Sequence, residues 1–127
     1  MTMKSKLRAT FLAAFMTLAM VAGNAQAQEI PLVNGDLWSK STEQVKKAYL
    51  VGVANVLQVE VAYQATNKPT DGQSLVAREV KGLQGQTLDS VRSKLDAWYA
   101  ANPDKLQRPV LETLWFEIVM PGLKQAK

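Results

Sequence analysis

The sequence is 127 residues long, 47% of its residues are hydrophobic, and it contains neither cysteine nor histidine. These absences exclude disulfides, thiolate chemistry and zinc sites built from cysteine and histidine, and they remove the commonest general base at neutral pH. The formal net charge of +4 comes largely from basic residues at the N-terminus.

Residues 1–27 have the pattern of a secretory signal peptide. The basic residues Lys4, Lys6 and Arg8 precede an uncharged apolar run over residues 9–23, which is shorter than the roughly 20 residues of a membrane-spanning helix. Ala25-Gln26-Ala27 then supplies the small residues of a cleavage site. We therefore expect a periplasmic mature protein of residues 28–127 with no membrane attachment after cleavage.

The mature part has almost no net charge. Twelve basic and eleven acidic residues remain in it, which gives +1, and the charges alternate in sign along the chain. A nucleic-acid-binding surface requires a concentrated positive charge. The sequence therefore predicts no nucleic-acid partner.

The mature chain opens with a short arm and a long apolar segment. Asn34-Gly35-Asp36 predicts a turn, after which Leu37 and Trp38 are expected to anchor the arm. Ser41 and Gln44 then fit a capping box, which predicts the start of a helix of about 20 residues. One face of this helix has apolar residues at spacings of three and four, namely Val45, Ala48, Tyr49, Gly52, Val56, Val59 and Tyr63, and a neighbouring stripe contains Leu50, Val53, Leu57 and Val61.

Because this segment is apolar nearly all round from Ala48 onward, we expect it to be buried centrally. Gly52 is expected to allow another helix to approach closely. The pairs Val51–Val53 and Val59–Val61 also alternate as in a β-strand, so a strand remains an alternative, although the length and the cap favour a helix.

Residues 64–73 are rich in Asn, Pro, Asp and Gly and predict a loop. A short helix over 74–81 should follow, with Gly82 and Gly85 ending it. Thr87 is expected to cap a second clear helix, in which Leu88, Val91, Leu95 and Trp98 face the core.

Prolines divide the rest of the chain. Asn102-Pro103-Asp104 ends the preceding helix and can begin a new element, and Pro109 marks a second start or a kink. The last helix should end at Pro121-Gly122. Its two apolar stripes contain Val110, Leu114 and Ile118, and Leu111, Trp115 and Val119. These elements predict an all-α fold, a small single-domain bundle of about four helices.

Catalysis by this chain would have to use carboxylates alone. Glu112 and Glu117 diverge on a helix, and Asp89 and Asp96 lie two turns apart, so neither pair has the separation that carboxylate hydrolases use. Glu60 is either a buried acid paired with Arg78 or Arg108, or the exposed position of its turn, which we favour because buried acids are rare. We predict no enzymatic activity and no cofactor or metal site.

Two aromatic residues and one loop are candidates for protein binding. Trp98 and Trp115 lie on apolar stripes and are expected in the core, whereas Tyr99 and Phe116 lie off them. Exposed rings at these two positions would suit an interaction surface, although both could instead cover the edge of the core. In the polar loop, the candidates are Asn67, Lys68, Pro69, Thr70 and Asp71, because loops on rigid scaffolds commonly bind partners.

The order of these motifs resembles the Tai/Rap family of periplasmic immunity proteins, which block peptidoglycan amidase effectors delivered by type VI secretion. The resemblance covers roughly residues 33–119. Asn34, Gly35 and Leu37 match the start of the family pattern, Tyr49, Gly52 and Asn55 match the first helix approximately, and Pro103, Leu106 and Pro109 match the close. The family usually carries paired cysteines, which this chain lacks. The all-helical domain is also similar to the HdeA-like acid-stress chaperones.

The resemblance implies a non-enzymatic protein that blocks a lytic amidase effector. A periplasmic stress chaperone is the alternative function, a weak carboxylate enzyme acting on cell wall is a third, and a homodimer is left open. A neighbouring effector gene would favour the first, and acid-triggered client binding the second.

Overall fold

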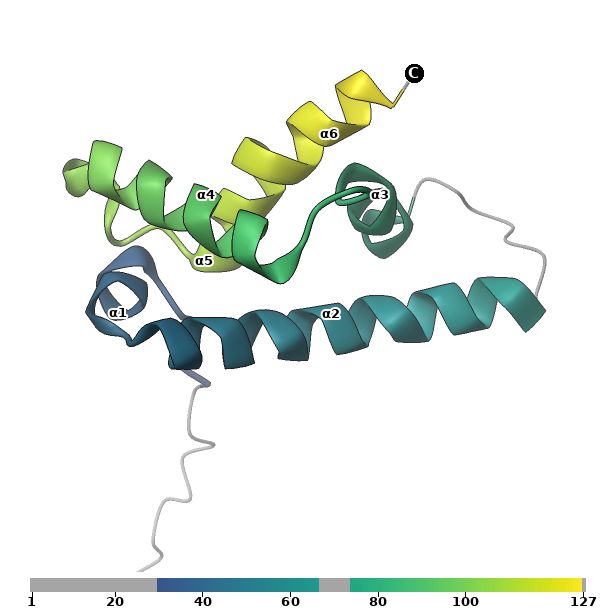
Figure 1. Cartoon of the computed structure of the whole chain (residues 1–127), viewed down its shortest axis with the longest axis horizontal. Helices are drawn as coiled ribbons and strands as arrows, with labels where there is room; N and C mark the ends of the chain where they lie inside the picture. Colours follow the sequence, from purple (N-terminus) through teal and green to yellow (C-terminus); the bar gives the residue numbers. More distant parts are fainter. Residues whose placement is uncertain (1–29, 67–73, 127) are drawn as a thin grey trace, which may run out of the picture.

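The computed structural model describes residues 30–66 and 74–126, and within these ranges it contains no β-strand. The expected signal peptide lies outside the described residues. The all-α prediction is confirmed (Figure 1). No helix in the described ranges combines the length and apolarity that a membrane crossing requires. In chain order the elements are α1 (Gly35–Lys40), α2 (Glu43–Thr66), α3 (Leu75–Gly82), α4 (Leu88–Ala101), the 3-10 helix η1 (Pro103–Lys105), α5 (Val110–Leu114), the π-helical turn η2 (Trp115–Val119) and α6 (Met120–Gln125).

The arm expected to turn at Asn34-Gly35-Asp36 instead forms helix α1. Asn34 is its N-cap, and its side-chain oxygen accepts a hydrogen bond of 3.0 Å from the amide of Leu37. The amide of Gly35 donates to the carbonyl of Arg108 at 3.1 Å, which docks the start of α1 on the η1–α5 connection. A Cβ atom at Gly35 would collide with the ring of Tyr99, so only glycine permits this approach.

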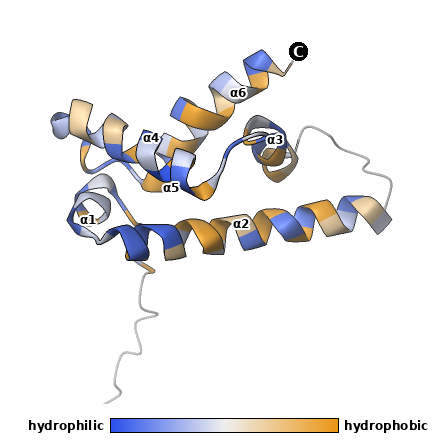
Figure 2. Cartoon of the chain, viewed as in Figure 1, coloured by the Kyte–Doolittle hydropathy of each residue, from blue (hydrophilic) through white to orange (hydrophobic). Residues whose placement is uncertain are grey.

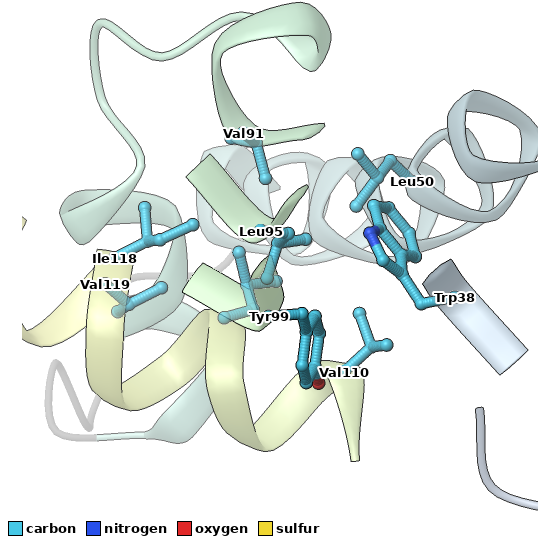
Figure 3. Packing of buried hydrophobic residues seen from close by; sticks show 9 residues of the cluster. Trp38, Leu50, Val91, Leu95, Tyr99, Val110, Ile118 and Val119 are labelled. Carbon is cyan, nitrogen blue, oxygen red and sulfur yellow. The ribbon is translucent and has the colours of Figure 1, made fainter. Parts of the chain in front are cut away.

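The core forms where side chains from α1, α2, α4 and the C-terminal helices meet (Figure 3). On α4 its members are Val91, Leu95 and Tyr99, which recur every four residues. Leu88, which we predicted to face the core, is instead partly exposed. Trp98 and Trp115 are only half-buried and pack against the edge of the core.

Helix α2 forms one side of the molecule instead of its centre, so the prediction of central burial is wrong. It runs along the length of the structure (Figure 1), and Leu50 is its only buried residue among those described. The stripe of Leu50, Val53, Leu57 and Val61 faces the other helices, whereas the stripe predicted first points largely to solvent. The capping residue is Thr42, whose hydroxyl oxygen accepts from the amide of Val45 at 3.3 Å, and not Ser41.

Close helix approach occurs at a different glycine from the one predicted. At Gly52 an added Cβ would meet no atom within 4 Å. Gly82 at the end of α3 and Gly122 in α6 instead face each other, and an added Cβ at Gly122 would collide with the carbonyl of Gly82. These two glycines therefore set the distance between α3 and α6.

We predicted that the last helix ends at Pro121-Gly122, and this prediction is wrong. The helix continues through α5, η2 and α6 to Gln125. The amide of Met120 donates to the carbonyl of Trp115, five residues back, which is the hydrogen bond of a π-helical turn. Pro121, which has no amide hydrogen to donate, follows this π-helical turn within the continuous helix.

Candidate protein-binding surface

Two of the residues that the sequence predicted for protein binding, Tyr99 and Phe116, lie within the described ranges. Asn67, Lys68, Pro69, Thr70 and Asp71 lie outside the described residues. The prediction for Tyr99 is wrong, because its side chain is only 2% exposed. Its hydroxyl lies 2.9 Å from the carbonyl oxygen of Arg108 and 2.9 Å from the hydroxyl of Thr113, and burial raises the pKa of the phenol.

Phe116 does lie at the surface, with 53% of its area exposed. Its ring contacts the guanidinium of Arg108, whose carbon lies 5.4 Å from the Phe116 ring centre and 4.9 Å from that of Trp98. The same guanidinium pairs with Glu112 at 3.2 Å and Glu117 at 2.9 Å. Arg108 is thus held by two rings and two carboxylates, and Phe116 belongs to a surface whose charges are already compensated.

Helix α2 divides into a charged beginning and an uncharged remainder. Near its start, Lys47 lies 3.0 Å from both Glu43 and Asp89 of α4, and Lys46 lies 2.9 Å from Asp96. After Lys47, the only charged residue of the helix is Glu60. Ion pairs therefore fix the start of α2 against α4, while the later turns have almost no charge.

The later turns of α2 expose large apolar side chains to solvent. Val56, Val59 and Tyr63 are 62%, 68% and 60% exposed, and Leu75 at the start of α3 is 60% exposed. We call these four residues the outer α2 surface. Coloured by hydropathy, α2 shows apolar segments along its length (Figure 2). Exposed apolar side chains are ordinary when scattered, but a group of them on neighbouring helices is typical of interaction sites.

The outer α2 surface contains an open hollow. It is lined by Val56, Val59, Glu60 and Tyr63 of α2 together with Val76 of α3. Helix α2 ends at Thr66 and Ser74 caps α3. The outer α2 surface therefore lies on both elements that flank the loop in which the sequence predicted binding residues.

Sequence reasoning missed this surface because it assigned the same apolar stripe to the core. The 3–4 spacing of Val56, Val59 and Tyr63 is the pattern of a packed helix face, and the pattern does not say what packs on it. The absence of charge on the outward positions was the available signal.

The acids near this surface differ in their surroundings. Neither arginine considered for Glu60 pairs with it: Arg78 lies over the Trp115 ring and Arg108 pairs with Glu112, while Glu60 accepts a hydrogen bond of 2.6 Å from Gln64. Glu60 is half-buried and not fully exposed. Glu79 of α3 lines an apolar pocket with Leu111 and Trp115, where burial raises the pKa of its carboxyl. Val56 and Leu75 of the outer α2 surface line the same pocket.

In residues 30–66 and 74–126, no group of three potential ligands comes together as a metal site. No protein-family model, curated protein or solved structure matches the chain. The geometry therefore shows an all-α domain with an exposed apolar surface on α2 and α3.

Proposed function

We propose that this chain is an exported, non-enzymatic protein that binds a protein partner through the outer α2 surface and the adjoining 67–73 segment. The observation that carries the proposal is the exposure of Val56, Val59, Tyr63 and Leu75 on two neighbouring helices. Protein interfaces have apolar, aromatic-containing centres that lack charge, and this surface has the same composition. The resemblance to Tai/Rap immunity proteins makes a peptidoglycan amidase effector the partner to test first.

The chemistry of the sequence also supports binding over catalysis. The chain has no histidine and no cysteine, which leaves carboxylates as its remaining acid–base groups near neutral pH. The two acids closest to each other on the C-terminal helix, Glu112 and Glu117, are both occupied by Arg108.

The test measures inhibition of peptidoglycan cleavage by type VI amidase effectors in the presence of the purified protein. Val59→Asp should abolish inhibition, because it places a charge at the centre of an apolar interface. The matched control is Val45→Asp, the same change at another exposed position of α2, about 21 Å away at 1.5 Å per residue. It should inhibit as the wild type does.

Three results would overturn the proposal. The first is equal inhibition by wild type and Val59→Asp. The second is release of soluble peptidoglycan fragments by the purified protein alone, which would establish an enzyme. The third is suppression of aggregation of acid-unfolded client proteins without inhibition of any amidase, which would establish the chaperone alternative.

A further inference from the structure

A separate cavity of about 320 Å³ lies between α2, α3 and α4. Its floor is formed by the core residues Leu50, Val91 and Leu114, and its walls are aliphatic side chains of α2 and α3. None of the described residues that line it is charged. It shares no lining residue with the hollow on the outer α2 surface.

The polar groups of the cavity lie in the connection before α4 and on α2. Three polar residues line it, Gln58, Gln86 and Thr87. The side-chain oxygen of Gln86 accepts hydrogen bonds from the Ser90 hydroxyl at 2.9 Å and from the Lys94 ammonium at 3.0 Å. Because the oxygen of the Gln86 amide is occupied by these two hydrogen bonds, its NH₂ group remains available as a donor. The Lys94 ammonium also places a positive charge next to Gln86, at the edge of an otherwise uncharged lining.

We propose that this cavity binds the aliphatic chain of a medium-chain carboxylate of about ten carbons, with the carboxylate near Gln86 and Lys94. The volume lies at the lower end of ligand pockets, which begin at about 300 Å³. It holds about ten methylene-sized units, if each occupies roughly the 30 Å³ of a liquid water molecule.

The lining and the charge select this class of ligand. A charged or strongly polar ligand body would lose its hydration against aliphatic walls without replacement hydrogen bonds. An anionic headgroup is best placed beside Gln86, because among the residues that line the cavity Gln86 is the one whose amide contacts an ammonium, that of Lys94. The inference does not depend on the proposed protein partner, because the two sites are lined by different residues.

Calorimetric titration of the purified protein with hexanoate, octanoate, decanoate and tetradecanoate tests the proposal. Affinity should rise about fourfold for each added methylene, the factor that corresponds to burying one CH₂ group. It should stop rising near ten carbons, when the cavity is full. A continued rise to fourteen carbons would indicate adsorption on exposed apolar surface and would overturn the proposal, as would a lack of binding across the series.

Substitutions locate the ligand. Ala54→Phe fills the cavity from α2 and should weaken decanoate binding at least tenfold, and Val80→Phe should do the same from α3. Val51→Phe is the matched control, because Val51 is an exposed residue of the same helix that does not line this cavity. Circular dichroism melts establish that each variant is folded. Wild-type affinity in both folded filling variants would place the ligand elsewhere.

The headgroup position has its own readout. Lys94→Met should weaken decanoate binding a few-fold, as expected for an exposed charge interaction, and should leave binding of the neutral decanol unchanged. Equal effects on decanoate and decanol would contradict the position of the carboxylate.

Discussion

The indole nitrogen of Trp38 donates a hydrogen bond of 2.8 Å to a carboxylate oxygen of Asp96, 58 residues away in sequence. The same oxygen lies 2.9 Å from the Lys46 ammonium, and the second oxygen accepts from the Arg92 guanidinium at 3.0 Å. Asp96 thereby joins α1, α2 and α4 through three donors. Trp38 is almost fully buried, so its N–H depends on this acceptor for its hydrogen bond.

Removal of the Asp96 carboxylate should therefore destabilise the protein. We expect Asp96→Ala to lower the free energy of unfolding by about 2–3 kcal/mol, because it leaves a buried indole donor and the Lys46 ammonium without their acceptor. Urea denaturation followed by circular dichroism measures this. Asp36→Ala is the control, since the carboxylate of Asp36 forms an exposed ion pair with Lys40, and it should cost less than about 1 kcal/mol. Equal losses would show that the Asp96 network adds nothing beyond a surface pair.

Tyr99 should contribute more to stability than its neighbour Trp98. Tyr99→Ala should cost about 3–5 kcal/mol, the range for removing a fully buried ring. Trp98→Ala should cost less, because Trp98 is half-buried and packs on the edge of the core. Tyr99→Phe should cost about 1–2 kcal/mol through loss of the hydroxyl contacts with Arg108 and Thr113. Thermal and chemical melts of the three variants check this order, and a larger loss for Trp98→Ala would contradict the core assignment.

The two glycines Gly52 and Gly122 should respond to alanine in opposite directions. Gly52→Ala should raise the free energy of unfolding by about 0.5–1 kcal/mol, because alanine favours the helix and the added Cβ meets nothing. Gly122→Ala should lower it by about 1–3 kcal/mol, because its Cβ would force α6 away from the carbonyl of Gly82. Denaturant midpoints measure both changes. Destabilisation by Gly52→Ala would mean that a contact covers this position in solution.

The contributions of Glu79 and Asp89 to stability should change with pH in opposite directions. Burial raises the pKa of Glu79, so the folded state binds the proton of this carboxyl more tightly than the unfolded state does. The resulting gain in the free energy of unfolding is present at low pH and is lost as the pH rises through the folded pKa. Glu79→Gln should therefore be more stable than wild type at neutral pH, and this advantage should disappear near pH 4. Unfolding midpoints of both proteins between pH 3 and pH 7 test the sign.

The second group, Asp89, has its pKa lowered by the Lys47 ammonium. Its stabilising contribution is present at neutral pH and is lost as the pH falls through the lowered pKa. Asp89→Asn should be less stable than wild type at pH 7, and the two should converge in acid. A difference in stability between the two proteins that stays constant from pH 7 to pH 3 would mean that the ion pair with Lys47 does not contribute.

The predicted helix starts that depend on a local cap or proline agree well with the structure. Thr87 caps α4 and forms a capping box with Ser90. Ser74 caps α3, and Pro103 and Pro109 stand at the starts of η1 and α5. Each of these signals acts through its own backbone, so it can be recognised without knowledge of the fold.

The candidate surface could not be found in the same way. An amphipathic stripe predicts that a helix face is apolar, and both stripes of α2 satisfy this condition. The contacts of α2 with α3 and α4 select the stripe that contains Leu50 and Leu57. Val56 and Val59 are thereby left at the surface.

By itself, the sequence determined that this protein is built from helices and where most of them begin, because caps, prolines and apolar spacing act over a few residues. Only the tertiary structure decided that Tyr99 is buried, that Gly122 and not Gly52 lies at a helix crossing, and that α2 keeps an apolar surface exposed. The physical reason is that a helix rotates by 100° at each residue. A helix that is apolar nearly all round, such as α2, therefore has several stripes that could each be buried. Packing between distant segments selects the one that is.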